Sequence, residues 1–457
     1  MTGKFLIRTL GCKANLADSQ AIARELERRG WGEAAEGEAP GLCIVNSCTV
    51  TDEADRQSRK MASRLSRLNP DARVVVTGCS AEVDPERLAG TSGIHYVVGN
   101  RDKPRLVERV LEALEGPRPE RGEILGVARG YDEIASRHPM DREWPEPAGE
   151  AESSTTRAFL KIQEGCNAFC TYCIIPYGRG PSRSLRPIEV VSAVREACAR
   201  GVRELVITGT NIGDYGTDLG EGPMLEELLG LVLSETPLER LRLSSLDPTE
   251  ITPGIVSLME REPRLCPHFH VSLQSASSRV LRLMKRKYGQ REAAECLERI
   301  AGITGGAFVG MDVIAGFPGE TEEEFEASLR LLERLPWSRL HVFPYSEREG
   351  TPATRLPGAV PPHVRSERAR RLRELSLSKM RAHYERAICE AGGGAIEGFL
   401  IERAHGGFAS GYSPGYLRAR VAEGTAARGE IVAVTPTGIA TDPAAGEVYF
   451  EAQVSRS

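Results

Sequence analysis

The chain has 457 residues, 40% hydrophobic and 27% charged, which is typical of a globular protein and too long for a single hydrophobic core. A formal net charge of −5 excludes a global basic field that would attract nucleic acid, and no apolar run approaches the roughly 18 residues of a membrane span. The N-terminus lacks a secretory signal pattern, and the cysteine count is eleven, an odd number. These features favour a cytoplasmic protein that uses its thiols for metal or cluster ligation rather than for disulfides.

Residues 1 to about 115 alternate strand-like and helical patterns. Strand-like runs lie at Lys4–Thr9, Leu42–Asn46, Arg73–Thr77 and Tyr96–Val98, and helical patterns lie near Leu16–Arg29, Ala54–Leu68 and Lys103–Leu114. Alternation with connections of this length predicts a parallel α/β sheet with right-handed crossovers. Residues 1–145 are assigned to this domain, and its end is a Pro- and acid-rich stretch typical of a linker.

Three cysteines of this domain follow three successive predicted strands. Cys12, Cys48 and Cys79 are separated by 36 and 31 residues, about the length of one βαβ unit. Parallel strands end at the same edge of a sheet, where open α/β sheets bind ligands, so the three loops can bring these cysteines together. Gly11 and Gly78 precede two of them and permit a close approach of the backbone to a bulky group. The pattern predicts a three-thiolate site.

A second group, Cys166, Cys170 and Cys173, lies within eight residues as C-x3-C-x2-C, with no fourth cysteine nearby. Structural zinc sites and electron-transfer iron–sulfur clusters usually have four protein ligands. Three thiolates can hold three irons of a 4Fe–4S cube and leave the fourth iron open to a reactant. A structural or zinc site completed by a distant ligand remains the alternative.

Six strand-like runs follow, separated by helical segments: Phe159–Gln163, Glu204–Thr210, Arg240–Leu246, Phe269–Gln274, Phe308–Ala315 and Leu340–Tyr345. Six units are too few for an eight-stranded barrel and predict an open, partial barrel with its site at the carboxyl ends of the strands. Residues 152–385 are assigned to this domain, which includes most of a charged helix at Pro362–Glu390. His268 and His270 alternate on one strand and are better explained as packed or hydrogen-bonded residues than as a metal pair.

Residues 386–457 contain no convincing helix. Alternating runs at Gly398–Glu402, Tyr416–Val421 and Glu430–Thr435, separated by Gly- and Pro-rich turns, predict a small all-β barrel. Its acidic residues outnumber its arginines, so its overall charge does not favour phosphate.

The second cysteine motif, with Tyr172 before its last cysteine, resembles that of the radical S-adenosylmethionine (SAM) enzymes. Two three-cysteine sites on adjacent α/β domains, followed by a β-barrel, are similar to one family among them, the methylthiotransferases. The local sequence is similar to its MtaB branch in Thr-Leu-Gly-Cys-Lys-Ala-Asn from Thr9, in Asn-Ser-Cys-Thr-Val-Thr from Asn46 and in Cys-Ile-Ile-Pro-Tyr-Gly-Arg-Gly from Cys173. The resemblance covers nearly the whole chain.

This resemblance implies an enzyme with SAM and two 4Fe–4S clusters as cofactors, in an α/β multidomain fold that ends in a TRAM barrel. The auxiliary cluster would be held by Cys12, Cys48 and Cys79 and would deliver sulfur. The cluster held by the second motif would generate the radical from SAM. The MtaB branch methylthiolates threonylcarbamoyladenosine beside the tRNA anticodon, which implies a tRNA partner, an electron donor such as flavodoxin or ferredoxin, a sulfur source and no membrane.

SAM-binding residues are expected at the strand ends of the partial barrel. The candidates are Tyr172, Gly209, Thr210, Asn211, Ser244, Ser245, Gln274, Ser275, Asp312 and Gly316. Each is also a residue type common in turns, but their position on one edge favours a ligand site.

Candidate RNA contacts are cationic or aromatic. Arg282, Lys285 and Arg286 belong to a run of five cations without an acid, and Arg365–Arg386 is a second cationic stretch. Tyr412 and Tyr416 are candidates for stacking on unpaired bases of the anticodon loop, with a role in the barrel core as the alternative.

Two other functions stay open. The same enzyme chemistry could act on isopentenyladenosine in tRNA or on an aspartate of a ribosomal protein. A non-catalytic iron–sulfur protein that binds RNA or transfers electrons is the more remote alternative, and it predicts complete four-thiolate sites.

Overall fold

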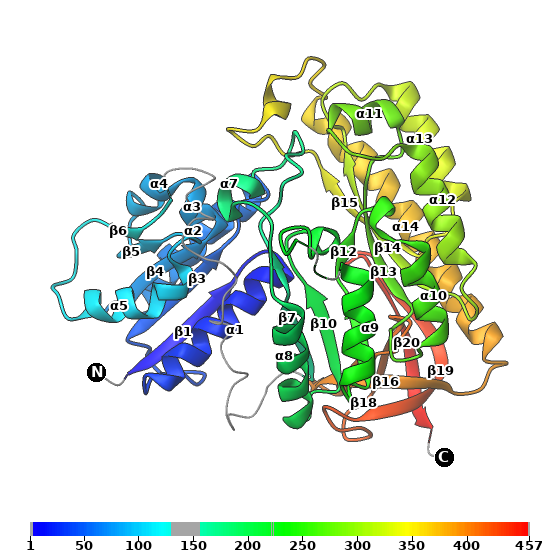
Figure 1. Cartoon of the computed structure of the whole chain (residues 1–457), viewed down its shortest axis with the longest axis horizontal. Helices are drawn as coiled ribbons and strands as arrows, with labels where there is room; N and C mark the ends of the chain where they lie inside the picture. The colour runs from blue at the N-terminus through cyan, green and yellow to red at the C-terminus, as the bar shows by residue number, and fades with distance from the viewer. Residues whose placement is uncertain (1–2, 129–155, 221, 223, 456–457) are drawn as a thin grey trace.

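The computed structural model describes residues 3–128, 156–220, 222 and 224–455. An α/β domain lies on one side of a second, partly closed barrel of strands and helices, and a small β-barrel lies at the base of the latter (Figure 1). Within the described residues, no helix has both the length and the apolar character needed to cross a bilayer.

The N-terminal domain is a six-stranded parallel sheet in the order β2-β1-β3-β4-β5-β6. The strands are β1 (Lys4–Thr9), β2 (Gly32–Glu33), β3 (Leu42–Ser47), β4 (Arg73–Gly78), β5 (Tyr96–Val98) and β6 (Glu123–Gly126). The helices are α1 (Lys13–Arg28), α2 (Asp52–Leu68), α3 (Cys79–Val83), α4 (Pro85–Ala89) and α5 (Leu106–Leu114). All four predicted strands are confirmed, and β2 and β6 add one short strand at each edge.

The sheet is buried on both faces, as a parallel sheet requires. All six residues of β3 are buried, and neighbouring side chains of this strand enter two different hydrophobic clusters. Ile44 packs with α1 and α5 on one side, and Val45 packs with α2 and α4 on the other. This sandwich holds the carboxyl ends of β1, β3 and β4 in fixed positions at one edge.

The second domain is a half-barrel of parallel strands with helices on its outer side. Its strand order is β7-β10-β11 followed by β12-β13-β14-β15. The third predicted strand is interrupted at Ser244, which divides it into β11 and β12. The strands are β7 (Arg157–Lys161), β10 (Glu204–Thr208), β11 (Arg240–Leu243), β12 (Ser245–Leu246), β13 (His268–Gln274), β14 (Phe308–Ala315) and β15 (Arg339–Pro344). The open partial barrel predicted from six strand-like runs is therefore confirmed.

The two faces of the half-barrel differ in chemistry. The outward side chains, such as Leu205, Leu241 and Val309, join one large core with the surrounding helices. These helices are α8 (Pro187–Ala199), α9 (Leu225–Glu235), α10 (Pro253–Arg261), α11 (Ser278–Leu283), α12 (Gln290–Ala301) and α13 (Glu322–Arg334). The alternate, inward positions in the strand register carry polar residues, including Arg157, Glu204, Arg242, His268, His270, Asp312 and His341. The concave face is therefore charged, not aliphatic.

The long helix α14 (Pro362–Glu390) connects the half-barrel to the last domain. It packs on β14 and β15 and then on β19 and β20. The last domain is a closed barrel of β16 (Ile396–His405), β17 (Phe408–Tyr412), β18 (Arg418–Ala422), β19 (Ile431–Asp442) and β20 (Glu447–Ser455). Met380 and Tyr384 of α14 belong to the core of this barrel, so the helix is shared between the two domains.

Candidate functional site

The first three-cysteine site lies at the carboxyl ends of three adjacent strands. Cys12 caps α1 after a two-residue loop that follows β1, Cys48 directly follows β3, and Cys79 opens α3 directly after β4. A Cβ built on Gly11 would lie 2.7 Å from Cys48 Sγ, so the first two loops are in contact. Burial, and then the neighbouring Cys79 and Cys12, raise the pKa of the Cys48 thiol to about 12. Stable thiolates at this edge therefore need nearby positive charge, which bound iron would provide.

Gly78 makes this arrangement sterically feasible. Its φ is +99°, and a Cβ at this position would overlap the backbone carbonyl oxygen of Ser47. Only glycine lets β4 turn directly into the helix that begins with Cys79 while β3 lies beside it. From the sequence, Gly78 was expected to allow the backbone to approach a bulky group closely. In the structure, Gly78 allows a close approach between the ends of β4 and β3.

The second three-cysteine site is formed by a single loop. The loop begins after β8 (Gln163–Glu164), carries Cys166, Cys170 and Cys173, and ends at α7 (Ile175–Arg179). The loop enters this path at Gly165, where φ is +77° and a Cβ would overlap the carbonyl oxygen of Pro181. Burial raises the pKa of both Cys166 and Cys173 to about 12.

Both donor sets fit iron–sulfur cubes that bind through three thiolates. Among the described residues, no three His, Cys, Asp or Glu side chains converge closely enough to bind a single metal ion. This leaves the cluster interpretation unaffected, because each thiolate of a cube binds a different iron. The zinc alternative gains no support from His268 and His270. His268 packs against the rings of both Phe308 and Tyr416, and His270 pairs with Asp312.

The loop that follows Cys173 returns to the first cysteine site. Helix α7 packs against α3, and Asn100 Nδ2 donates to the carbonyl oxygen of Gly178 at 2.6 Å and lies 3.6 Å from Cys79 Sγ. Helix α7, at the end of the second cysteine loop, therefore contacts the first cysteine site across the boundary between the α/β domain and the half-barrel.

Arg179 carries a positive charge into this boundary. Its guanidinium is buried, donates to Asn15 and Glu164, and lies 3.3 Å from Asp18. Burial would lower its pKa, but Cys79 and the carboxylates around it raise the pKa well above the usual range. Sequence analysis missed this role, although Arg179 belongs to the motif that follows Cys173.

The loop after β10 is attached to the strand before the second cysteine motif. The backbone N–H groups of Thr210 and Asn211 donate to Gln163 Oε1 at 3.0 and 2.8 Å, and a Cβ on Gly209 would lie 2.8 Å from the Gln163 carbonyl oxygen. These three predicted SAM-binding residues are therefore placed near the cysteine loop.

The remaining predicted SAM-binding residues lie at different heights along the strands of the half-barrel, some at strand ends and one within a strand. Ser244, Ser245, Gln274 and Ser275 lie at strand ends, with Gln274 in the left-handed region at φ 60°. Asp312 lies within β14 on the concave face, 2.8 Å from His270 Nε2. Gly316 closely approaches Arg365 of α14, and the ring of Tyr172 packs on Phe317. Tyr172 and Gly316 thus have structural contacts within the chain.

Three carboxylates near Cys166 were missed by sequence analysis. Cys166 is affected electrostatically by Asp214 and Asp247, and Asp247 in turn affects Glu250. Burial, and then Asp247, raise the pKa of Glu250 to about 7. The sequence feature that could have revealed two of these carboxylates is the turn Asp-Pro-Thr-Glu from Asp247, which directly follows the third predicted strand. A cationic ligand such as SAM would be attracted by this cluster.

Arg286 is buried beside the second cysteine site and does not extend from the surface. Its Nη1 lies 3.1 Å from Cys170 Sγ, its Nη2 donates to Asp247, and its side chain is 7% exposed. The expectation of a phosphate contact is therefore corrected for Arg286, because Asp247 and Cys170 engage its guanidinium. Arg282 and Lys285 of the same run are exposed. In the second cationic stretch, Arg368 is paired with Glu320 and Glu322.

Tyr412 and Tyr416 pack under the base of the half-barrel. Their rings stack at 4.8 Å, Arg157 lies over both, and Arg242 lies 5.0 Å from the ring of Tyr416. The other face of Tyr416 meets His268 at 4.3 Å. Side chains of the protein itself thus pack against the rings that were expected to stack on RNA bases. In this structure, both tyrosines belong to the interface between the half-barrel and the terminal barrel.

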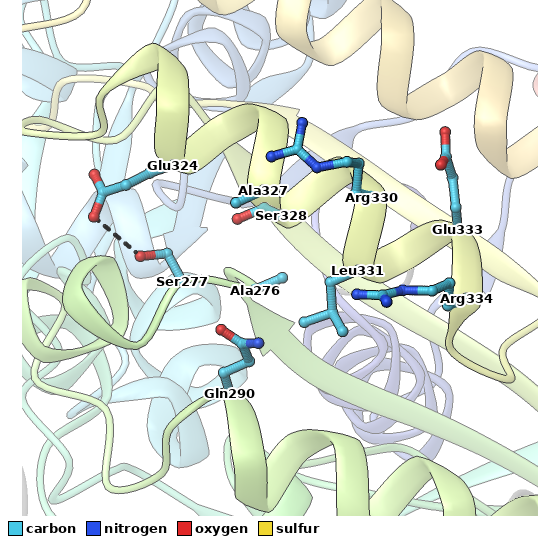
Figure 2. A pocket seen from close by; sticks show the side chains of 10 residues that line it. All are labelled: Ala276, Ser277, Gln290, Glu324, Ala327, Ser328, Arg330, Leu331, Glu333 and Arg334. Atoms are coloured by element: carbon cyan, nitrogen blue, oxygen red, sulfur yellow. Dashed lines mark hydrogen bonds between the residues drawn. The ribbon is translucent and has the colours of Figure 1, made fainter.

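A surface pocket lies elsewhere, on the outer side of the half-barrel. Figure 2 shows it between α13, the segment before α11 and the first residue of α12, with Ser277 donating to Glu324 at 3.2 Å across one end. It contains none of the predicted site residues.

The chain matches two family models, that of the radical SAM superfamily over residues 160–332 and that of the uncharacterized protein family UPF0004 over residues 4–99. A threonylcarbamoyladenosine tRNA methylthiotransferase MtaB of Bacillus subtilis (strain 168) is 37% identical over 84% of this chain and 83% of its own length. That of Rickettsia prowazekii (strain Madrid E) is 34% identical over 94% of both chains.

A tRNA-2-methylthio-N(6)-dimethylallyladenosine synthase of Thermobifida fusca (strain YX) is 32% identical over 81% of this chain and 73% of its own length. Among solved structures, the radical SAM methyltransferase TsrM from Kitasatospora setae matches with a TM-score of 0.57 at 17% identity, covering 77% of each chain, which shows a shared fold. On the strength of these matches, the chain belongs to the radical SAM methylthiotransferases of the MtaB type.

Proposed function

We propose that this protein is a tRNA methylthiotransferase that converts threonylcarbamoyladenosine beside the anticodon to its 2-methylthio form. The observation that supports this most is the contact between α7, which ends the second cysteine loop, and Cys79 of the first set of three cysteines. The relatives named for this reaction match over most of their length.

The cofactors of this enzyme are SAM and 4Fe–4S clusters. We assign the radical SAM cluster to Cys166, Cys170 and Cys173 and the auxiliary cluster to Cys12, Cys48 and Cys79. When bound, these groups supply hydrogen abstraction, sulfur and a methyl group for an adenine C–H bond that has neither acidity nor a leaving group.

The chain's own residues would position and shield the reactants. The backbone of Gly209–Asn211 lies near the cysteine loop, and Asp214, Asp247 and Glu250 give this region the negative charge that suits the ammonium and sulfonium groups of SAM. The N–H groups of Arg286 donate to Cys170 Sγ and Asp247, which holds that thiolate and that carboxylate together. Cys170 is buried, whereas Cys166 and Cys173 are half-buried and remain accessible to a ligand.

The assignment implies partners. A tRNA anticodon loop is the substrate, a small electron-transfer protein such as flavodoxin or ferredoxin supplies electrons, and a sulfur source replenishes the auxiliary site. The reaction would then occur in the cytoplasm. Within the chain, residues 1–145 would carry the auxiliary cluster, residues 152–385 the radical chemistry, and residues 386–457 a TRAM-like barrel.

Nucleoside analysis tests this proposal. We expect tRNA from a strain that lacks the gene to have lost 2-methylthio-threonylcarbamoyladenosine and to retain threonylcarbamoyladenosine, and we expect the wild-type gene to restore the methylthio group. Unchanged tRNA would reject the proposal. Loss of the methylthio group from isopentenyladenosine instead would favour the second substrate, since relatives at 32–33% identity are named for dimethylallyladenosine.

A further inference from the structure

Lys13 is a residue of the α/β domain whose side chain reaches the concave face of the half-barrel. It directly follows Cys12 and is the first residue of α1, which lies beside β7 (Figure 1). Its electrostatic neighbours come from separate parts of the chain: Arg157 of β7, Arg242 of β11, Asp312 of β14 and Tyr416 of the terminal barrel. The ammonium group is therefore located among the inward-facing side chains of the half-barrel.

Other cations of this concave face have acidic partners. Arg242 pairs with Glu204 at 2.8 Å, Arg157 pairs with Glu402, and Lys161 pairs with Asp18 and Glu164. In the part of the chain that the structure describes, Lys13 has no hydrogen-bonding or ion-pairing partner. A partly buried ammonium that makes no direct ion pair is costly. An anionic ligand would remove this cost.

Two histidine rings and the carboxylate of Asp312 lie near this position. The rings of His270 and His341 stack at 5.0 Å, and His270 Nε2 lies 2.8 Å from Asp312. Burial, and then Arg339, lower the pKa of His341 to about 4, so it is uncharged at neutral pH. The cluster thus offers an ammonium group that makes no ion pair, next to imidazole donors and acceptors, which suits a small carboxylate that also carries amide and hydroxyl groups.

We propose that Lys13 binds the carboxylate of the threonylcarbamoyl group and so selects adenosines that carry this acidic modification. The inference rests on the proposed function and names the group that the site recognises. The threonylcarbamoyl group is attached to C6 of the same six-membered ring in which C2 is methylthiolated. Because Lys13 adjoins Cys12 of the proposed auxiliary site, its side chain is placed to reach a substituent of an adenine bound there. An uncharged isopentenyl group would leave the ammonium unpaired and is selected against.

The experiment compares two forms of one tRNA, with threonylcarbamoyladenosine or with unmodified adenosine at the target position. Equilibrium binding is measured with anaerobically reconstituted holoenzyme, and iron and sulfide are counted because Lys13 adjoins Cys12. We expect wild type to prefer the modified tRNA about ten- to hundredfold, as one charge-assisted hydrogen bond provides. Lys13→Met is expected to reduce this preference to about one with full cluster content. Lys60→Met, which removes an exposed lysine of the same domain, is expected to retain it.

Two further measurements keep the inference falsifiable if Lys13→Met folds poorly. Lys13→Gln retains length and polarity but loses the charge, and is expected to lose the preference as well. With wild type, the free nucleoside threonylcarbamoyladenosine is expected to compete for the site, and its methyl ester, which lacks the negative charge, to compete at least tenfold less.

Equal weakening of both tRNAs in the Lys13 variants would overturn the inference, since Lys13 would then contact backbone phosphate. An unchanged preference, or a wild-type enzyme that methylthiolates without any preference, would overturn it too. A wild-type holoenzyme that binds the tRNA but forms no methylthio product would reject the proposed function instead.

Discussion

The two cysteine sites have the same ligand set but are assembled in different ways. Cys12, Cys48 and Cys79 come together only when three strands of a parallel sheet are in register. Cys166, Cys170 and Cys173 lie in one loop, whose path depends on local backbone geometry. The first site therefore depends on the tertiary structure of a whole domain, and the second depends mainly on eight residues of sequence.

This difference has a functional consequence. A site built on three strand ends has ligands that cannot move independently of the sheet. A loop site can be reorganised without unfolding the domain. Buried polar groups around Arg179 and Asn100 connect the two sites, so each also depends on the domain boundary.

Cysteine replacement separates the two sites most strongly. We expect Cys48→Ala to abolish methylthiolation, to lose about half of the roughly eight irons of two cubes, and to retain reductive SAM cleavage. Cys170→Ala is expected to abolish both activities while the auxiliary cluster stays bound. Iron and sulfide counting, with assays of deoxyadenosine and modified tRNA, checks this. Cys389→Ala, at an exposed cysteine outside both sites, is the control. If Cys48→Ala leaves iron content and product intact, the auxiliary site is misassigned.

Arg179→Met tests the connection between the sites. The change leaves the buried Asp18 and Glu164 with less positive charge, and breaking a buried ion pair costs about 3–5 kcal/mol of unfolding free energy. Burial opposes ionisation of Glu164, but Arg179 and Lys161 outweigh it and lower its pKa to about 2.

A depressed carboxyl pKa contributes stability above the unfolded value of about 4.3, and this contribution is lost as pH falls through about 2. The difference between wild type and Arg179→Met should therefore be largest above about pH 4.5 and shrink toward pH 2. Denaturant unfolding at several pH values measures it. A difference that is constant across this range would show that Arg179 does not stabilise the charged form of Glu164.

Gly78→Ala should disturb the sheet-based site alone. Its left-handed φ of +99° costs about 1–3 kcal/mol for alanine, and its Cβ also meets the backbone of β3. Gly201→Ala is the matched control, with a similar φ of +82° and no atom within 4 Å of the added Cβ. We expect lower thermal stability and auxiliary iron content for Gly78→Ala than for Gly201→Ala, with SAM cleavage retained in both. Equal behaviour of the two variants would show that contact with β3 is unimportant.

The same contrast explains what could be predicted from sequence. Long apolar runs such as β3 and β4 are recognisable because they are buried on both faces. The two-residue β2 is polar and depends on pairing with β1, so no local pattern marks it. The cysteines could be found because their spacing follows the strand–helix repeat.

The contacts of side chains whose partners are distant in the sequence could not be predicted in this way. Arg286 belongs to a cationic run, but its burial depends on Asp247, 39 residues earlier. Tyr416 lies in a loop of the terminal barrel, and its environment is set by Arg157 and Arg242 of the half-barrel. Such contacts across domains are determined by the tertiary structure and not by neighbouring residues.

Replacing surface cations should have the smallest effect on activity. Neither cysteine site depends on these residues, so their replacement separates tRNA binding from the integrity of the two sites. Arg282 and Lys285 are exposed, so we expect Arg282→Glu and Lys285→Glu to weaken tRNA binding and each to reduce the salt slope by about one. Arg286→Gln, within the same run, should leave the slope unchanged. It should instead lower the reduction potential of the radical SAM cluster, because Cys170 loses its hydrogen bond. Salt titrations of tRNA affinity and a redox titration separate the two effects, and a reduced salt slope for Arg286→Gln would restore its phosphate contact.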